Sequence, residues 1–168
     1  MAAPSLNESE LRFLRALLRR EVKFMVVGLS AAALQGAPVV TQDVGFWFED
    51  FNDPRIREAL HAAGAAYVPP SIINPPMFAG GGVELFDIVL VMEGLERFSE
   101  EMKNCVEVPL GRQKLKVLRL DRILASKRAA NRAKDRLIIP VLEDSIAANK
   151  VEARHGKQKK AVKTTDGL

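Results

Sequence analysis

Two aspartates and a glycine turn are the features of this sequence whose residue types and spacing could do chemistry. Asp43 lies near the start of a strand-like stretch, TQDVGFWF (residues 41–48), and Asp87 lies within the apolar run 83–92. A carboxylate in such a run is costly unless it is paired, hydrogen-bonded or bound to a metal ion. Gly28-Leu29-Ser30 lies between a predicted strand and a predicted helix, where backbone N–H groups favour a phosphate. Together these features predict a metal and phosphate site, with structural aspartates as the alternative.

Gly45 decides what kind of site Asp43 can belong to. Residues i and i+2 of a strand point to the same face, so a carboxylate at position 45 would share a metal ion with Asp43. Glycine offers no ligand, and it weakens the interior of a strand by roughly 0.5–1 kcal/mol. The stretch is consistent with half of a metal site, with a site that has lost a ligand, or with an ordinary strand that begins with Asp.

The elements that must position these residues alternate between helical and extended patterns. Helices are predicted at 6–20 (with a capping box at Ser5 and Glu8), 31–35, 53–64, 121–131 and 134–149, the last interrupted by Pro140. Strands are predicted at 22–27, 42–49, 65–68, 83–92, 105–108 and 114–118, with the run 83–92 at the centre of the sheet. The loop 69–82 is unusually long, and such loops are often functional. This order predicts a small mixed sheet covered by helices, an α/β (α+β) fold with C-terminal helices.

Charge is concentrated at the end of the 168-residue chain. The net charge is +4, and residues 149–168 alone carry six basic and two acidic residues, so residues 1–148 are neutral. The neutral part has the size of one ordinary domain. We predict a single domain over 1–148 and a basic, disordered tail over 149–168. A contact of this tail with the phosphate backbone of RNA or DNA is the sharper alternative.

Composition excludes several classes of protein. Cys105 is the single cysteine, so neither a disulfide framework nor a cysteine zinc site is expected within the chain. No apolar run approaches the roughly 18 residues that span a membrane. The N-terminal residues lack the basic and apolar regions of a signal peptide. We therefore expect a cytoplasmic protein with no membrane partner.

The segment VVGLSAAALQGAPVVTQDVGFWF (residues 26–48) resembles the core motif of polymerase-beta-like nucleotidyltransferases. The likeness is closest to the small microbial group of toxin–antitoxin and abortive-infection nucleotidyltransferases. These proteins show a Gly-Gly or Gly-Ser turn, a short helix that ends in Gly, a Thr, and Asp-x-Asp on a strand. The residues at the corresponding places are Gly28, Gly36, Pro38, Thr41 and Asp43.

Downstream segments extend the resemblance to residues 22–145. The strand with Asp87 looks like the strand of the family's third carboxylate. Residues 117–135 look like its C-terminal helical segment, in which the matching positions are Lys127, Arg132, Lys134 and Asp135. Lys127 and Lys134 are seven residues apart, so we expect them to share a helix face that meets phosphates; a solvated charged face is the alternative.

The resemblance implies transfer of a nucleoside monophosphate from a Mg-bound NTP to a hydroxyl. Two metal ions can clamp the attacking and leaving oxygens in such a reaction, and Mg²⁺ (or Mn²⁺) suits carboxylate oxygens. It implies Asp43 and Asp87 as catalytic metal ligands, and Gly28, Ser30 and Lys127 as nucleotide ligands. The implied partners are the nucleotide, an acceptor that is tRNA, another RNA, a protein or a small molecule, and a cognate antitoxin or toxin protein.

Gly45 departs from the family pattern because it occupies the second Asp of the Asp-x-Asp pair. With two carboxylates in place of three, a second metal ion would be poorly held, so we expect transfer to be weakened or lost. The alternative is a non-catalytic module of the same fold that binds nucleotide, RNA or a protein partner. A further alternative is an unrelated α/β domain in which Asp43 and Asp87 are structural.

Overall fold

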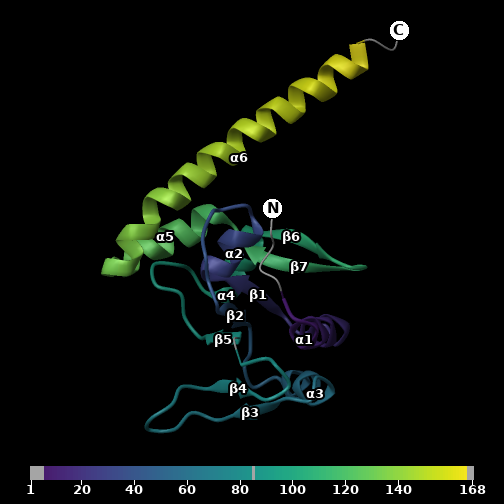
Figure 1. Ribbon diagram of the computed structural model, residues 1–168, viewed down its shortest axis with the longest axis vertical. Coiled ribbons are helices and arrows are strands. Elements are labelled where there is room, and N and C mark those ends of the chain that lie inside the picture. The colour runs from purple at the N-terminus through teal and green to yellow at the C-terminus, as the bar shows by residue number, and fades with distance from the viewer. Residues whose placement is uncertain (1–5, 85, 166–168) are drawn as a thin grey trace.

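A mixed β-sheet forms the centre of the computed structural model, which describes residues 6–84 and 86–165. Within this part of the chain the five strands of the sheet lie in the order β5-β2-β1-β7-β6 (Figure 1). Their bounds are β1 (Phe24–Val27), β2 (Val44–Phe48), β5 (Phe86–Val89), β6 (Cys105–Leu110) and β7 (Gln113–Leu118). β1 pairs antiparallel with β2 and parallel with β7, β2 and β5 are parallel, and β6 and β7 form a hairpin.

Helices pack around this sheet and confirm the predicted α/β class. α1 (Glu8–Arg19) contacts α3 (Pro54–Ala62), and α2 (Gly28–Leu34) packs on β1, β2 and β7. α5 (Leu120–Ala130) packs on α2 and on the long α6 (Ala133–Thr165). The short α4 (Phe98–Glu101) and the 3₁₀ turn η1 (Met102–Asn104) precede the β6–β7 hairpin. β3 (Ala66–Val68) and β4 (Met77–Ala79) form a separate two-stranded sheet beside α3 (Figure 1).

Alternation along β2 separates an aromatic core from the face that carries the predicted site. Phe46 lies against Phe13 of α1, with ring centroids 6.5 Å apart, and Phe86 of β5 lies 5.5 Å from the same ring. Gly45 and Asp87 are paired across β2 and β5 and point to the opposite face, on which α2 packs. A shift of β2 by one residue would exchange the two faces, so the aromatic core fixes the register that the site needs.

The strand predicted over 83–92 is shorter than expected and lies at the edge of the sheet. β5 spans only Phe86–Val89 and pairs with β2 alone, so the predicted central position was wrong. The apolar continuation leaves the sheet, and Leu90 and Val91 are 58% and 79% exposed. Its apolar composition therefore reflects one face packed on Phe13 followed by an exposed apolar loop, not a strand buried on both faces.

The start of α1 also differs from the prediction. The capping box consists of Asn7 and Glu10: the Asn7 side chain accepts from the Glu10 N–H at 2.9 Å, and the Glu10 carboxylate accepts from the Asn7 N–H at 2.7 Å. Ser5 lies outside the described residues. The two-residue displacement places α1 at Glu8–Arg19, within the predicted range of 6–20.

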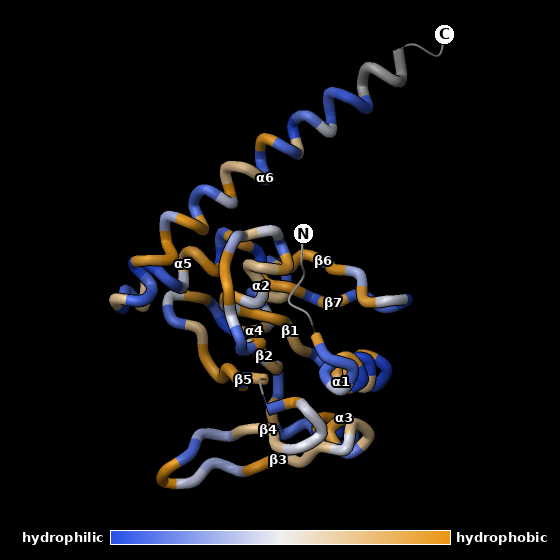
Figure 2. The backbone as a smooth tube through the Cα atoms, viewed as in Figure 1, coloured by the Kyte–Doolittle hydropathy of each residue, from blue (hydrophilic) through white to orange (hydrophobic). Residues whose placement is uncertain are grey.

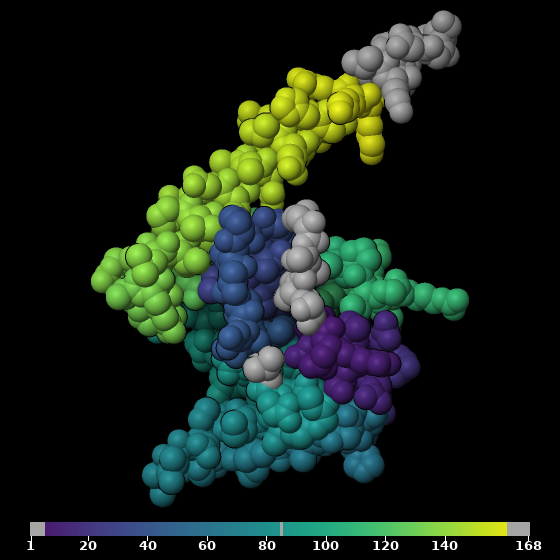
Figure 3. All heavy atoms as spheres, viewed as in Figure 1, coloured from purple at the N-terminus to yellow at the C-terminus, as the bar shows by residue number. Residues whose placement is uncertain are grey.

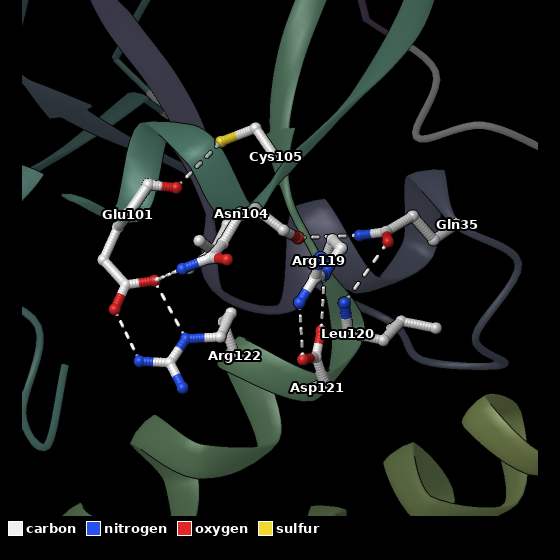
Figure 4. Close-up of polar contacts among 9 residues, drawn as sticks. Gln35, Glu101, Asn104, Cys105, Arg119, Leu120, Asp121 and Arg122 are labelled. Carbon is white, nitrogen blue, oxygen red and sulfur yellow. Dashed lines mark hydrogen bonds and ion pairs between the residues drawn. The ribbon is translucent and has the colours of Figure 1, made fainter. Parts of the chain in front are cut away.

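A buried carboxylate joins η1 and α5. The Glu101 side chain is 0% exposed and accepts from Arg122 Nε at 2.9 Å and from Asn104 Nδ2 at 3.2 Å (Figure 4). The hydrogen bonds from Arg122 hold the pKa of Glu101 below its usual value, against desolvation, which raises it. Gln35 adds a link from α2, because its amide group donates to the Leu118 carbonyl at 2.8 Å and accepts from the Leu120 N–H at 3.3 Å. These contacts fix the start of α5.

We expect Glu101→Gln to lower the free energy of unfolding by about 2–3 kcal/mol, because it removes a charged hydrogen-bonding partner from Arg122 in a buried place. Urea denaturation measures this loss. Glu100→Gln, which removes an exposed pair with Lys103, is the matched control and should leave the stability nearly unchanged. Equal effects of the two substitutions would contradict the role of Glu101.

α6 continues well beyond the domain boundary predicted at residue 148. Residues 149–165, predicted to be disordered, lie in this helix, which also runs without a break across Pro140 (Figure 1). Its C-terminal half projects from the body of the molecule (Figure 3) and is mostly hydrophilic (Figure 2). Residues 166–168 lie outside the described part of the chain. None of the described helices combines the length and apolar content that a membrane span requires.

Candidate functional site

A cavity of about 360 Å³ lies on the face of the sheet opposite to the aromatic core. Its wall contains every residue predicted for the site, namely Asp43, Gly45, Asp87, Gly28, Ser30 and Lys127. These residues come from the start of β2, from β5, from the β1–α2 turn and from α5. The fold therefore brings together the segments that the sequence analysis selected separately.

Asp43 and Asp87 lie on adjacent strands and face the same cavity. Asp87 is paired with Gly45, and Asp43 comes two residues before Gly45 on the same side of β2. The two carboxylates are near enough for the charge of Asp43 to act on Asp87. The pKa of Asp87 is raised, first by desolvation and then by the negative charge of Asp43. The Asp87 residue as a whole is exposed and lines the cavity, so it is not a core residue.

These two carboxylates fit one hard cation better than two. Mg²⁺ is commonly bound through one or two carboxylates, with water and substrate phosphate oxygens completing its coordination. Within the described residues, no group of three or more His, Cys, Asp or Glu side chains is placed to hold a metal ion. The donor set therefore suits a single ion that a phosphate ligand helps to hold.

Gly45 lies in very close contact with the end of β1. A Cβ atom at this position would be 3.2 Å from the Val27 carbonyl oxygen and 3.3 Å from Val27 Cγ2. The Ser30 hydroxyl donates to the same carbonyl at 2.9 Å and accepts from the Gly45 N–H at 3.3 Å. Any side chain at position 45 therefore requires Val27 to move by a few tenths of an ångström.

Ser30 is 1% exposed, and its single hydroxyl proton is used in the bond to Val27. In this arrangement Ser30 joins the β1–α2 turn to β2 through its side chain. Gly28 has a φ of +70°, which L side chains rarely adopt, so a glycine suits this turn. Gly28, Leu29 and Ser30 all line the cavity, so the start of α2 belongs to its wall. Phosphate binding by Gly28 and Ser30 stays a prediction.

The basic side of the cavity is built around buried Asp135. Asp135 is 1% exposed and accepts from Arg132 Nε at 2.6 Å, while Lys127 Nζ lies 3.2 Å from its other oxygen. Hydrogen bonds from Arg132, the largest effect, and from Lys127 lower the pKa of Asp135 to about 2. Lys127 and Arg132 are thereby held at the cavity wall by a carboxylate from the first turn of α6.

Lys134, which the sequence analysis expected to meet phosphates together with Lys127, is a cation of the cavity. It lines the cavity and forms no ion pair with the described residues. The expectation that Lys127 and Lys134 share one helix face was wrong, because α5 ends at Ala130, the following Asn131 has a φ of +47°, and α6 begins at Ala133. The two side chains reach the same cavity from different helices. The break between the helices was predicted at 131–134; what the sequence did not give is the angle at which the second helix leaves the first.

No family model matches the chain, and no curated protein matches it in sequence. In structure it is similar to ANT(2″)-Ia in a crystal structure with adenylyl-2″-tobramycin, with 14% identity and a TM-score of 0.55, covering 90% of this chain and 95% of that one. It is also similar to the solution structure of the antibiotic-resistance factor ANT(2″)-Ia, with 15% identity and a TM-score of 0.56, covering 94% and 96%. The fold is nucleotidyltransferase-like. At these identities the similarity extends to the fold alone, and it spans nearly the whole chain.

The ion cluster of Asp135 makes the stability of this nucleotidyltransferase-like domain depend on pH. Because the pKa of Asp135 is lowered from 3.8 to about 2, its contribution to the stability of the folded state is present above pH 4. This contribution is lost as the pH falls toward 2. We expect Asp135→Asn to cost about 2 kcal/mol at pH 7 and progressively less below pH 4. Urea denaturation at a series of pH values measures the difference. A difference that does not change between pH 7 and pH 2 would contradict the ion cluster.

Proposed function

We propose that this protein binds a Mg-bound nucleoside triphosphate in the cavity, and that Gly45 leaves nucleotidyl transfer to a hydroxyl weakened or lost. The observation that carries the proposal is the convergence of Asp43 and Asp87 on one cavity, whose wall also contains the β1–α2 turn and Lys134. A nucleotide needs both a cation for its phosphates and donors for their oxygens. The nucleotidyltransferase-like fold supports this assignment at the level of architecture.

Each wall of the cavity has a distinct task in this proposal. Asp43 and Asp87 hold the metal ion, and the backbone N–H groups of Gly28, Leu29 and Ser30 contact the phosphates. Lys134 neutralises phosphate charge, while Lys127 and Arg132, fixed by Asp135, keep the basic wall in place. A bound Mg²⁺ (or Mn²⁺) ion would supply positive charge next to the reacting phosphate.

Asp87 is the residue best suited to accept the proton of an attacking hydroxyl. It lines the cavity next to Asp43, where a hydroxyl held beside the metal ion would meet its carboxylate. Gly45 offers no carboxylate for a second ion, so charge on the leaving phosphates would be less well neutralised. Binding without efficient transfer is the expected consequence.

The proposal extends to the molecule that accepts the nucleotidyl group and to a partner protein. The crystal structure of one structural neighbour is of a complex with adenylyl-2″-tobramycin. An aminoglycoside hydroxyl is therefore one acceptor to test. RNA, including tRNA, and protein hydroxyls are the other acceptors, as the family resemblance implies. The same resemblance implies a cognate antitoxin or toxin, which co-purification of the chain with its genomic neighbours would test.

Four proteins test nucleotide binding and transfer together: the wild type, Asp43→Asn, Gly45→Asp and Gly45→Asn. We expect the wild type to bind labelled NTP with Mg²⁺, and Asp43→Asn to bind it at least tenfold more weakly. Label transfer to RNA, protein or tobramycin should rise at least tenfold in Gly45→Asp and not in Gly45→Asn. The last two variants press equally on Val27 and differ in charge, so their comparison separates the carboxylate from the strain.

The binding and transfer outcomes are separable. Absence of Mg-dependent NTP binding in both the wild type and Gly45→Asp would overturn the proposed function. Binding without a gain of transfer in Gly45→Asp would leave a nucleotide-binding module and would remove Gly45 as the cause of weak transfer. Circular dichroism and urea denaturation of Gly45→Ala measure how much of any effect comes from the contact with Val27 alone.

A further inference from the structure

The C-terminal half of α6 is a basic helix that lies outside the cavity and its chemistry. Residues 147–160 are all exposed, and the end of the helix projects from the body (Figure 3). Residues 150–160 contain five basic residues and one acidic residue, Glu152. The segment thus carries most of the excess charge of the chain. Its first turn lies beside the body, where the Asn149 side chain donates to the Gln35 carbonyl and Lys150 lines a groove with Gln35 and Arg119. The end of the helix extends away from the body.

Three cations form a stripe along this helix. Lys150, Arg154 and Lys157 follow at spacings of four and three residues, so they lie on one side and extend over about 10 Å. Glu152 lies on another side of the helix, and none of the three cations forms an ion pair with a described residue. Like charges at this spacing repel one another. An extended anion that runs along the stripe would remove this repulsion.

The composition of the helix indicates which kind of extended anion would bind along the stripe. Val151 is the one large apolar residue within 150–160, so the helix lacks the apolar face that binding to a membrane surface requires. No Phe, Tyr or Trp occurs in residues 133–165, so bases of a single strand would find no aromatic side chain to stack on. These two features favour a duplex contacted through its phosphates.

The width of a single helix favours B-form DNA over an RNA duplex as the ligand. An α-helix with its side chains is about 10–12 Å across, and the major groove of B-DNA is about 12 Å wide. The major groove of an RNA duplex is too narrow for side chains to read. In a groove, Lys150, Arg154 and Lys157 would face one backbone while Lys159, on the opposite side of the helix, would face the other.

We propose that the C-terminal half of α6 binds the phosphate backbone of duplex DNA, with the helix in the major groove and with little dependence on sequence. This binding is separate from the proposed nucleotide site. A protein that makes such backbone contacts binds DNA with a dissociation constant of roughly 10⁻⁴ to 10⁻⁶ M at physiological salt. Its affinity falls steeply as salt rises, because each neutralised phosphate releases counterions.

Fluorescence anisotropy with a labelled 20-base-pair DNA duplex, measured from 50 to 200 mM salt, tests this proposal on the full chain. Substitution of Lys150, Arg154 and Lys157 by Gln should lower the affinity at least tenfold at 50 mM salt. It should also reduce the slope of log affinity against log salt by about 3. Gln is a good helix former, and circular dichroism verifies that the helix content is kept.

The matched control replaces Arg12, Arg15 and Arg19 of α1, three exposed arginines at similar spacing, by Gln. This variant has the same net charge as the α6 variant and should bind DNA like the wild type. Asp43→Asn should also bind DNA normally, which separates this proposal from the nucleotide site. Equal losses in the α1 and α6 variants, or no salt-dependent binding by the wild type, would overturn the proposal. Equal or tighter binding to an RNA duplex, single-stranded DNA, polyglutamate or anionic lipid vesicles would overturn the choice of duplex DNA.

Discussion

The close approach of β1 and β2 at Val27 and Gly45 is the constraint on which the site depends. A Cβ atom at position 45 would be 3.2 Å from the Val27 carbonyl oxygen, so the strands meet where a side chain fits poorly. The Ser30 hydroxyl bonds both partners of this contact and ties the turn at Gly28 to β2. The glycine that removes a ligand is therefore also the residue that lets the end of β1 lie so close to β2.

The remaining structure holds this contact in register. On one face, Phe46 and Phe86 pack against Phe13, which prevents β2 and β5 from sliding. On the other face, Trp47 is buried against Phe98, with ring centroids 5.6 Å apart, so it supports the site by packing. Glu101 and Gln35 fix α5, and Asp135 fixes the turn into α6. The acidic and basic walls of the cavity thus belong to one rigid arrangement of strands and helices.

Local chemistry made much of this arrangement predictable. Alternation in residues 41–48 predicted β2 and the face of Asp43, and the glycine at position 28 predicted the turn into α2. The sequence could not reveal that Asp87 lies on an edge strand, because strand order depends on packing between distant segments. It also could not show that Lys134 reaches the cavity from a different helix than Lys127, since that depends on the left-handed turn at Asn131. The extension of α6 beyond residue 149 was hidden because its C-terminal half is mostly hydrophilic.

The central claim is that Asp43 and Asp87 hold one divalent cation against a nucleotide. Paramagnetic broadening of backbone amide signals by Mn²⁺, with a non-hydrolysable NTP present, tests it directly. The account predicts selective broadening of amides in residues 28–30, 43–45 and 86–88, and its loss in Asp43→Asn. Broadening confined to other acidic surfaces, or unchanged in Asp43→Asn, would contradict it.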